Sequence, residues 1–232
     1  MITRFAKIAL GTLAVTVTVC AHAADEDVLN NSVRVGAYYI TYDTAADDLR
    51  GPYVPAGVNI KLKDLVTPYF AYVRRLSPHF SAELALGAPP LTKTYGKGPA
   101  TLGSVPYNDQ EIVTARWLAP TLLLNYMFFD ESARLRPYIG AGINYTRFYS
   151  RQSTAAGDAA SGGPTSISLT TSVGPAATVG VSYRITRHFT LYGSLSASQV
   201  DSDLTANTAG VLRKTHVSFN PRAAVLAAGY SF

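Results

Sequence analysis

The chain has 232 residues, of which 15% are charged, and its 20 lysines and arginines slightly outnumber its 15 aspartates and glutamates. A mild positive balance without a basic run argues against nucleic acid as a partner. The single cysteine, Cys20, lies in an N-terminal segment that we predict to be removed, which leaves no thiol for disulfides, nucleophilic catalysis or metal ligation. We therefore predict no nucleic-acid partner, no metal and no cofactor.

Residues 1–23 have the features of a secretory signal peptide: a basic start, a short apolar stretch and a small-x-small cleavage site that ends at Ala23. A lipoprotein signal using Cys20 is the alternative, but Val19 is bulkier than the small residue that such signals place there. We predict cleavage after Ala23, which leaves 24–232 as one domain. Because two of the 20 basic residues leave with the signal, the mature chain has a formal charge of +3.

Beyond residue 23 the apolar residues recur with a period of two, which is the period of a β-strand. No run there approaches the ~18 apolar residues that a membrane helix needs. A chain with 15 tyrosines and few charges is typical of membrane strands in which apolar and polar residues alternate. In chain order, the pattern predicts strands at 32–42, 65–75, 80–87, 112–129, 136–148, 168–183, 189–198 and 217–232.

The connections between these strands alternate in length. Short turns separate the long loops, which are polar or rich in small residues, Gly and Pro and are predicted at 43–64, 88–110, 150–165 and 199–214. Outer-membrane barrels have long external loops and short periplasmic turns, whereas a soluble sandwich does not normally sort its connections in this way. We therefore predict an all-β fold, an eight-stranded antiparallel up-and-down transmembrane β-barrel in a bacterial outer membrane.

Aromatic residues gather near the short turns and the C-terminus, where an outer-membrane barrel carries its periplasmic aromatic girdle. They are Tyr126, Phe128, Tyr183, Phe189, Tyr230 and Phe232. A proline in a closed barrel needs a bulge or a strand end, because it lacks an N–H. Prolines fall in or near the predicted strands at Pro68, Pro120, Pro137, Pro175 and Pro221. For Pro175, in the middle of its strand, we expect a local bulge.

The last strand ends on an aromatic residue. Its alternate positions place Tyr230 and Phe232 on one face, and small residues dominate the other. A Tyr-x-Phe end resembles the terminal strand of bacterial outer-membrane barrels, in which the C-terminal aromatic is part of the signal read by the barrel assembly machinery. The resemblance implies that this machinery is a partner and that Tyr230 and Phe232 form the signal. A soluble strand that happens to end the chain is the alternative.

Several segments resemble the OmpW family of eight-stranded outer-membrane proteins. The most specific is 136–146, with the sequence RPYIGAGINYT, and the others are 33–37, 118–121 with Asn125 and Tyr126, Asn220 with Pro221, and 229–232. The resemblance implies a narrow channel for small, mainly hydrophobic molecules, with release sideways into the surrounding outer-membrane lipid. Arg222 departs from the pattern, because an aromatic or aliphatic outward residue is expected there.

Residues on the inward face of the predicted strands are candidates for lining a path through the barrel: Phe70, Tyr72, Trp117, Leu123, Met127, Tyr138 and Tyr192. The alternative is that these side chains only fill the interior, as is common in eight-stranded barrels. Arg74 and Glu83 also take the inward face, on strands joined by a short turn, and we predict an ion pair between them. That pair either neutralises a buried charge or acts as a gate at the periplasmic end.

Three functions are open. The first is an outer-membrane channel for small, mainly hydrophobic solutes, and the second is a non-conducting structural or adhesive barrel that acts through its external loops. The third is a lipid A-modifying enzyme, because His216 and Ser218 resemble the His-x-Ser pair of outer-membrane lipid A deacylases, with Asp201 or Asp203 to orient the imidazole. Both residues take the outward face at a strand rim, where a His and a Ser are most often plain surface groups. We therefore predict that the chain is not an enzyme.

Overall fold

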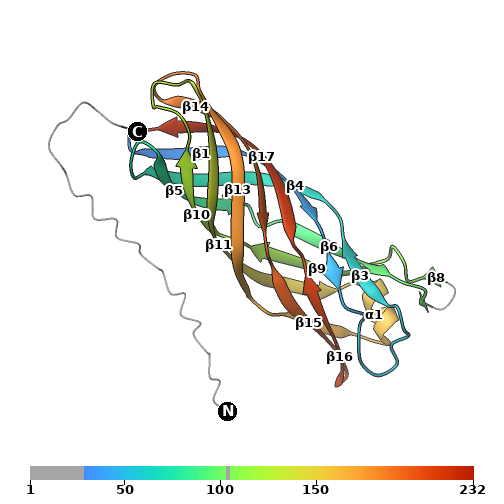
Figure 1. The fold of residues 1–232 in the computed structure, drawn as a ribbon. Helices are drawn as coiled ribbons and strands as arrows, with labels where there is room; N and C mark the ends of the chain where they lie inside the picture. The colour runs from blue at the N-terminus through green and yellow to red at the C-terminus, as the bar shows by residue number, and fades with distance from the viewer. Residues whose placement is uncertain (1–28, 103–104) are drawn as a thin grey trace, which may run out of the picture.

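A computed structural model describes residues 29–102 and 105–232, so the predicted signal peptide lies outside the described residues. Within them, eight strands close into an antiparallel barrel (Figure 1). In their order around the barrel they are β1 (Asn31–Tyr42), β4 (Leu65–Arg75), β5 (Phe80–Gly87), β10 (Thr121–Met127), β11 (Leu135–Ser153), β13 (Ser172–Arg184), β14 (Phe189–Ser198) and β17 (Pro221–Ser231). The pairing of β1 with β17 closes the ring. The predicted eight-stranded up-and-down barrel is confirmed.

The barrel wall reverses the polarity of a water-soluble protein. Outward side chains are apolar and exposed, as Val35, Leu124 and Val179 show, each with more than half of its surface free. Inward positions hold small or polar groups such as Thr146 and Ser182, which are buried. Alternation along each strand produces both faces at once. Such a wall suits lipid on the outside and a packed interior.

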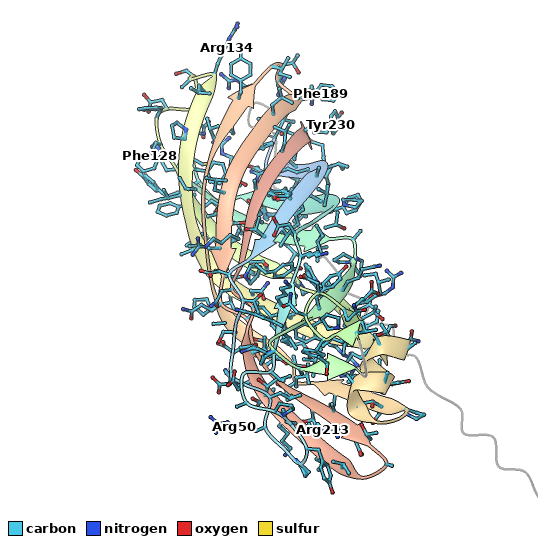
Figure 2. The ribbon with its side chains drawn as sticks, turned by 90° about the vertical axis from the view of Figure 1, so that its right-hand side faces the viewer. Arg50, Phe128, Arg134, Phe189, Arg213 and Tyr230 are labelled. Carbon is cyan, nitrogen blue, oxygen red and sulfur yellow. The ribbon has the colours of Figure 1, made fainter. Side chains whose placement is uncertain are left out.

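The two ends of the barrel differ. Short turns join β4 to β5, β10 to β11 and β13 to β14 at one end, where the C-terminus also lies (Figure 1). The predicted aromatic girdle is found there: the ring of Tyr230 contacts Phe189 and Phe232, and the ring of Tyr126 contacts Phe128. Figure 2 shows Phe128, Phe189 and Tyr230 at this end. We call it the turn side and the opposite end the loop side.

Regular structure continues on the loop side well beyond the barrel. Three strands extend the barrel sheet from β11, namely β9 (Glu111–Leu118), β6 (Leu91–Lys97) and β3 (Asn59–Leu62). A second sheet contains β12 (Thr165–Leu169), β15 (Asp201–Thr208), β16 (Val211–Ser218) and β2 (Ala45–Ala46). The other described elements are the hairpin strands β7 (Thr101–Leu102) and β8 (Val105–Pro106), and helix α1 (Ala155–Ser161).

The predicted loops 150–165 and 199–214 are therefore largely regular structure. Strands β15 and β16 form a hairpin because Ala209 and Gly210 both adopt positive φ angles, of 49° and 91°, and such a turn matches the twist of paired strands. Helix α1 begins where the Thr154 hydroxyl caps its N-terminus. The polar and small composition of both segments was typical of loops, but their local signals specify a hairpin and a helix.

Breaks divide three predicted strands. Ala119 and Pro120 separate β9 from β10, so that β10 pairs with the turn-side half of β11 and β9 with its loop-side half. The predicted strands 168–183 and 217–232 are likewise each divided between a loop-side strand and a barrel strand. Each break lies where the chain leaves the barrel, so the loop-side sheets are free to take another direction.

Prolines in the wall lie where a neighbouring strand has just ended. Pro175 pairs with β11 in an unbroken register, and its carbonyl accepts from the backbone N–H of Gln199, the first residue beyond β14. The nitrogen of Pro175 points to the same side as its carbonyl, toward the chain just beyond the end of β14. The missing N–H therefore leaves no carbonyl within β14 without its hydrogen bond. The predicted bulge at Pro175 is wrong. Pro68 and Pro137 follow the same rule, since their carbonyls accept from the first residue beyond β5 and β10.

The loop-side sheets enclose a conventional apolar core. Val217 is completely buried there, and the rings of Phe148 and Phe219 lie 5.4 Å apart between centroids. At its rim, the Arg222 guanidinium forms an exposed ion pair of 2.7 Å with Asp43, so this charge has a counterion on the outer surface. No helix in the described part of the chain is long and apolar enough to cross a membrane.

Candidate functional site

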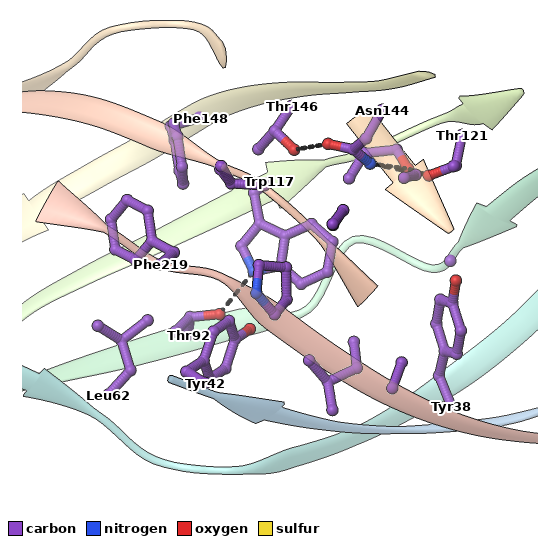
Figure 3. A pocket seen from close by; sticks show the side chains of 18 of the residues that line it. Tyr38, Tyr42, Leu62, Thr92, Trp117, Thr121, Asn144, Thr146, Phe148 and Phe219 are labelled. Atoms are coloured by element: carbon purple, nitrogen blue, oxygen red, sulfur yellow. Dashed lines mark hydrogen bonds between the residues drawn. The ribbon is translucent and has the colours of Figure 1, made fainter. Parts of the chain in front are cut away.

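A cavity of about 100 Å³ occupies the loop-side half of the interior; we call it the loop-side cavity. Figure 3 shows aromatic and aliphatic side chains that line it, among them Tyr42, Leu62, Trp117, Phe148 and Phe219. Some of the polar groups in the lining form hydrogen bonds with one another. The indole N–H of Trp117 donates to Thr92 at 2.8 Å, and Asn144 donates to Thr121 at 2.8 Å. A lining of this kind favours an apolar occupant.

A charged layer closes the barrel beneath this cavity. Arg34 from β1 and Glu83 from β5 form an ion pair of 2.7 Å, and both side chains are at most 5% exposed. The second carboxylate oxygen of Glu83 accepts from the Tyr69 hydroxyl at 2.6 Å, and Asn125 Nδ2 donates to the paired oxygen at 2.7 Å. We define the charged layer as Arg34, Glu83, Tyr69 and Asn125. Paired and hydrogen-bonded charges can remain ionised in such an interior.

Two tyrosines complete the closure around the charged layer. The Arg34 guanidinium lies 3.6 Å from the ring centroid of Tyr192 and 5.9 Å from that of Tyr138. Glycines on the facing strands make room for both rings. A Cβ atom on Gly229 would lie 2.5 Å from Tyr192, and one on Gly180 would lie 2.6 Å from Tyr138. The layer is therefore packed tightly against the wall.

On the turn side of the charged layer a wider space of about 390 Å³ opens; we call it the turn-side vestibule. Arg34 lines its floor, and further arginines line its walls. The interior is thus divided into an apolar part and a basic part. The charged layer separates them.

The wall beside the loop-side cavity is thin. A groove on the outer surface of β1, β13, β14 and β17, which we call the wall groove, shares four lining residues with the cavity inside. They are Ala177, Ser196, Ala197 and Ala223. Small side chains here leave little more than backbone between the cavity and the outside of the barrel.

Five of the predicted path-lining residues face the interior. Leu123 and Tyr138 are buried, whereas Trp117, Met127 and Tyr192 are partly buried. Leu123 and Trp117 line the loop-side cavity, and Met127 and Tyr192 line the turn-side vestibule. Their role in lining a solute path stays a prediction.

Phe70 and Tyr72 were predicted to face inward, and this is wrong. Both point outward and are about 40% exposed, with relative exposures of 44% and 40%. The register of β4 against β1 places Phe70 opposite Val35 and Tyr72 opposite Val33, so all four belong to the lipid-facing surface. Both faces of 65–75 carry large apolar groups, and the period alone therefore did not reveal which face is inside.

The predicted ion pair of Arg74 and Glu83 is also wrong. Glu83 does face inward, but its partner is Arg34, and Arg74 points outward at the turn-side end of β4 near Asn31. An arginine that faces outward at a strand end can place its guanidinium in water or among lipid headgroups, so an outward orientation carries little cost there. The sequence held the signal for Arg34, which lies between the outward Val33 and Val35 and so had to face inward.

His216 and Ser218 lie on β16, in the loop-side sheet. His216 Nδ1 is 2.8 Å from Asp203 Oδ1, and this hydrogen bond raises the pKa of the imidazole above its ordinary value. The Ser218 hydroxyl donates to Asp201 at 2.6 Å, so its proton points to a carboxylate and not to the imidazole that would have to remove it. His216, Asp201 and Asp203 are solvent-exposed on the hairpin, and Ser218 is partly buried. This geometry does not favour a nucleophilic serine.

A comparison with protein-family models identifies the family of this chain. The model described as the OmpW family matches residues 30–232, which is most of the chain. This chain belongs to the OmpW family. The resemblance in sequence segments is thereby confirmed, and so is the predicted location in the bacterial outer membrane, where relatives of this OmpW-family protein are placed by name.

Curated relatives match part of this OmpW-family chain. Outer membrane protein W of Escherichia coli (strain K12) is 38% identical over 124 residues, which is 53% of this chain and 57% of that protein. Outer membrane protein W of Vibrio cholerae serotype O1 is 30% identical over 147 residues, or 63% and 65%. The dibenzothiophene metabolism operon protein DoxH of Pseudomonas sp. (strain C18) is 32% identical over 122 residues, or 50% and 51%. The matched parts thus span between half and two thirds of these relatives.

Solved structures share the fold. The outer membrane protein OprG from Pseudomonas aeruginosa superimposes with a TM-score of 0.78, at 20% identity over 88% of this chain and 95% of that one. The E. coli outer membrane protein W gives 0.55, at 23% identity over 90% and 100%. In outer-membrane barrels short turns face the periplasm. The turn side of this OmpW-family barrel is therefore the periplasmic side, and its wall contacts lipid.

Proposed function

We propose that this OmpW-family barrel takes up small, mainly hydrophobic molecules from the external side through its loop-side cavity. The observation that carries the proposal is the contrast between this apolar cavity and the charged layer beneath it. The apolar side chains of the cavity bind an apolar solute by removing it from water. Further movement toward the turn side would bring the solute against the buried Arg34–Glu83 ion pair, which is unfavourable. A solute in the cavity therefore has a reason to leave by another route.

The wall groove offers that route, and we propose that solutes leave there, sideways into the membrane. Ala177, Ser196, Ala197 and Ala223 line both the cavity and the groove, so a small separation of strands joins the two spaces. Strand β17 begins with Pro221, which cannot donate a hydrogen bond to the ladder. A relative named for a dibenzothiophene metabolism operon supports an apolar solute, because dibenzothiophene is an aromatic hydrocarbon-like compound.

A disulfide across β14 and β17 tests the exit. Leu195 and Ala224 are directly paired in the wall groove, and the double substitution Leu195→Cys, Ala224→Cys would hold the strands together. The pair Leu191 and Ala228 lies four residues away on the same two strands, so it has the same residue types and the same phase of the ladder. It provides the matched control, and the mature chain contributes no other cysteine.

Uptake of an apolar fluorescent probe by cells that carry each variant gives the readout. We expect the oxidised Leu195–Ala224 variant to lose uptake, a reductant to restore it, and the Leu191–Ala228 control to behave as wild type. Equal uptake by both oxidised variants would overturn the sideways exit. If wild-type barrel neither conducts in planar bilayers nor raises uptake, the channel fails and the non-conducting structural or adhesive barrel replaces it.

We also propose that the barrel assembly machinery reads Tyr230 and Phe232. Both rings are exposed on the turn side, with relative exposures of 44% and 52%. Replacing Phe232 with Ala is expected to lower the fraction of folded barrel in the outer membrane, seen as heat-modifiable migration on a gel. Replacing Phe128, an equally aromatic girdle residue, provides the control and should leave that fraction unchanged.

A further inference from the structure

The outer face of β6, β9 and β11 changes from apolar to basic along one line. The three strands are neighbours in the sheet, on the loop side of the barrel (Figure 1). On each of them, the last exposed apolar residue toward the loop side is followed two positions further by an exposed basic residue. Arg147 follows Tyr145 on β11, Arg116 follows Leu118 on β9, and Lys93 follows Leu91 on β6. We call Arg147, Arg116 and Lys93 the basic row.

The strand alternation fixes the outward direction of the basic row. Phe148 and Trp117, the chain neighbours of Arg147 and Arg116, line the loop-side cavity on the opposite face of the sheet. The inward neighbours are large and aromatic, so the arginines have no room to turn into the interior. The row therefore belongs to the outer surface of the barrel.

The register brings the members of the row together. Arg147 is directly opposite Leu118, two positions from Arg116, and Lys93 is opposite Thr114, also two positions from Arg116. Each basic residue is thus a diagonal neighbour of the next, roughly 7–8 Å away. Two long side chains at this spacing can reach one phosphate group between them.

The basic row lies at the external edge of the lipid-facing band. Ile139 pairs with Tyr126 of the aromatic girdle, and Arg147 follows eight positions further along β11. With a rise of about 3.3 Å per residue and a tilt of about 40°, eight positions advance about 20 Å along the membrane normal. The apolar band of such barrels is about 25 Å tall, and a long arginine side chain spans the remainder. The guanidinium groups therefore reach the depth of the external headgroups.

Much of the charge of the row is not cancelled within the described part of the chain. Glu111, the only acidic residue of β6, β9 and β11, pairs with Lys93 at 2.8 Å. Arg116 donates to the backbone carbonyl of Pro89, which holds the guanidinium without neutralising it. The side chain of Arg147 forms neither a hydrogen bond nor an ion pair with the described residues. Two guanidinium charges thus remain available to an anion outside the barrel.

We propose that the basic row binds a phosphate of a lipid A headgroup in the external leaflet. The acyl chains of such a lipid lie against the apolar wall below the row, where Leu118 and Leu91 are exposed, and its phosphorylated head then meets Arg116 and Arg147. Arginine matches phosphate oxygens in geometry as well as charge. Basic clusters at a membrane boundary are the pattern that anionic lipid headgroups recognise. An acidic protein would match the charge but not the apolar surface that continues directly from the row.

Native mass spectrometry of the refolded mature chain in detergent, titrated with bisphosphorylated lipid A, tests the site. We expect saturable binding of lipid A and weaker binding in higher salt. The double substitution Arg116→Gln, Arg147→Gln should lower the affinity about 25-fold, because each basic residue near an anionic surface contributes about a factor of five. Arg50→Gln with Arg222→Gln is the matched control. It removes the same charge from two exposed loop-side positions near β16 and on β17, and should bind as wild type.

Lipid A from which both phosphates have been removed tests the same site without any substitution. It keeps the acyl chains, so wild-type protein should bind it about as weakly as the double variant binds the bisphosphorylated form. Heat-modifiable migration shows whether each variant folds, and the comparison of the two lipids remains decisive if the double variant does not. Equal affinity of wild type for both lipids would overturn the proposal, as would a double variant that binds no more weakly than the control pair. Neither result depends on transport of an apolar solute.

Discussion

The barrel and the loop-side extension of this chain use the same strand pattern with opposite polarity. In the barrel wall, apolar residues such as Leu124 face outward and polar residues such as Asn125 face inward. In the extension, Val217 and Phe219 are buried and polar side chains such as Asp203 are exposed. The difference reflects the solvent, which is lipid around the barrel and water around the extension. The loop-side cavity lies where the two interiors meet, and it inherits its apolar lining from the extension.

The charged layer should show the largest effect. Replacing Glu83 with Ala leaves Arg34 buried without a counterion, and we expect the free energy of unfolding to fall by about 3–5 kcal/mol. Equilibrium urea unfolding of the refolded barrel in detergent measures it. Replacing the outward Arg74 with Ala is the control, with an expected change within about 0.5 kcal/mol. An equally large loss in both variants would support the predicted pair of Arg74 with Glu83, and no loss in the Glu83 variant would contradict a buried ion pair at this residue.

Two exposed leucines, one facing lipid and the other facing water, should differ in how well they tolerate replacement by a charged residue. Leu124→Arg places a guanidinium on the lipid face of β10 and is expected to destabilise the barrel by about 2–4 kcal/mol in a bilayer. Leu212→Arg makes the same change on β16, where the exposed leucine meets water, and should alter stability by less than about 0.5 kcal/mol. Both leucines are about half exposed, at 51% and 47%. Unfolding in lipid vesicles compares them, and equal losses would contradict a boundary between the two regions.

A small pH effect is expected in the extension alone. His216 faces Asp203, Asp201 and Asp47, and its hydrogen bond to Asp203 raises its pKa above 6.5, the ordinary value. The pKa of His216 is higher in the folded state than in the unfolded state. The stabilisation from its interaction with Asp203 is therefore fully present at a pH below the unfolded-state pKa, and it is lost as the pH rises through the folded-state pKa. The protection factor of the β16 amides, which is the intrinsic exchange rate divided by the observed rate, should therefore be highest in mild acid. Asp203→Asn should remove this pH dependence, and a dependence that survives in the variant would assign it to another group.

The sequence predicted the barrel well because its alternating strands and alternating loop lengths are both local patterns. It could not orient 65–75, where large apolar groups occupy both faces and only pairing with β1 decides the direction. The partner of Glu83 was predicted wrongly for the same reason. Either Arg34 or Arg74 could have paired with Glu83, and the orientation of 65–75 decided which of the two faces inward. The β15–β16 hairpin was missed because polar residues cover its outer face, as they do in loops.

Trp117 allows the most direct test of the proposed function. It is the only tryptophan of the chain, and it lines the loop-side cavity. A small aliphatic solute without ultraviolet absorption, such as cyclohexane, should shift the emission of Trp117 in the refolded barrel and should do so saturably. Filling the cavity with Ala115→Phe, at a buried lining position, should abolish the shift. Unchanged emission of the wild-type protein up to the solubility limit of the solute would contradict an apolar binding cavity.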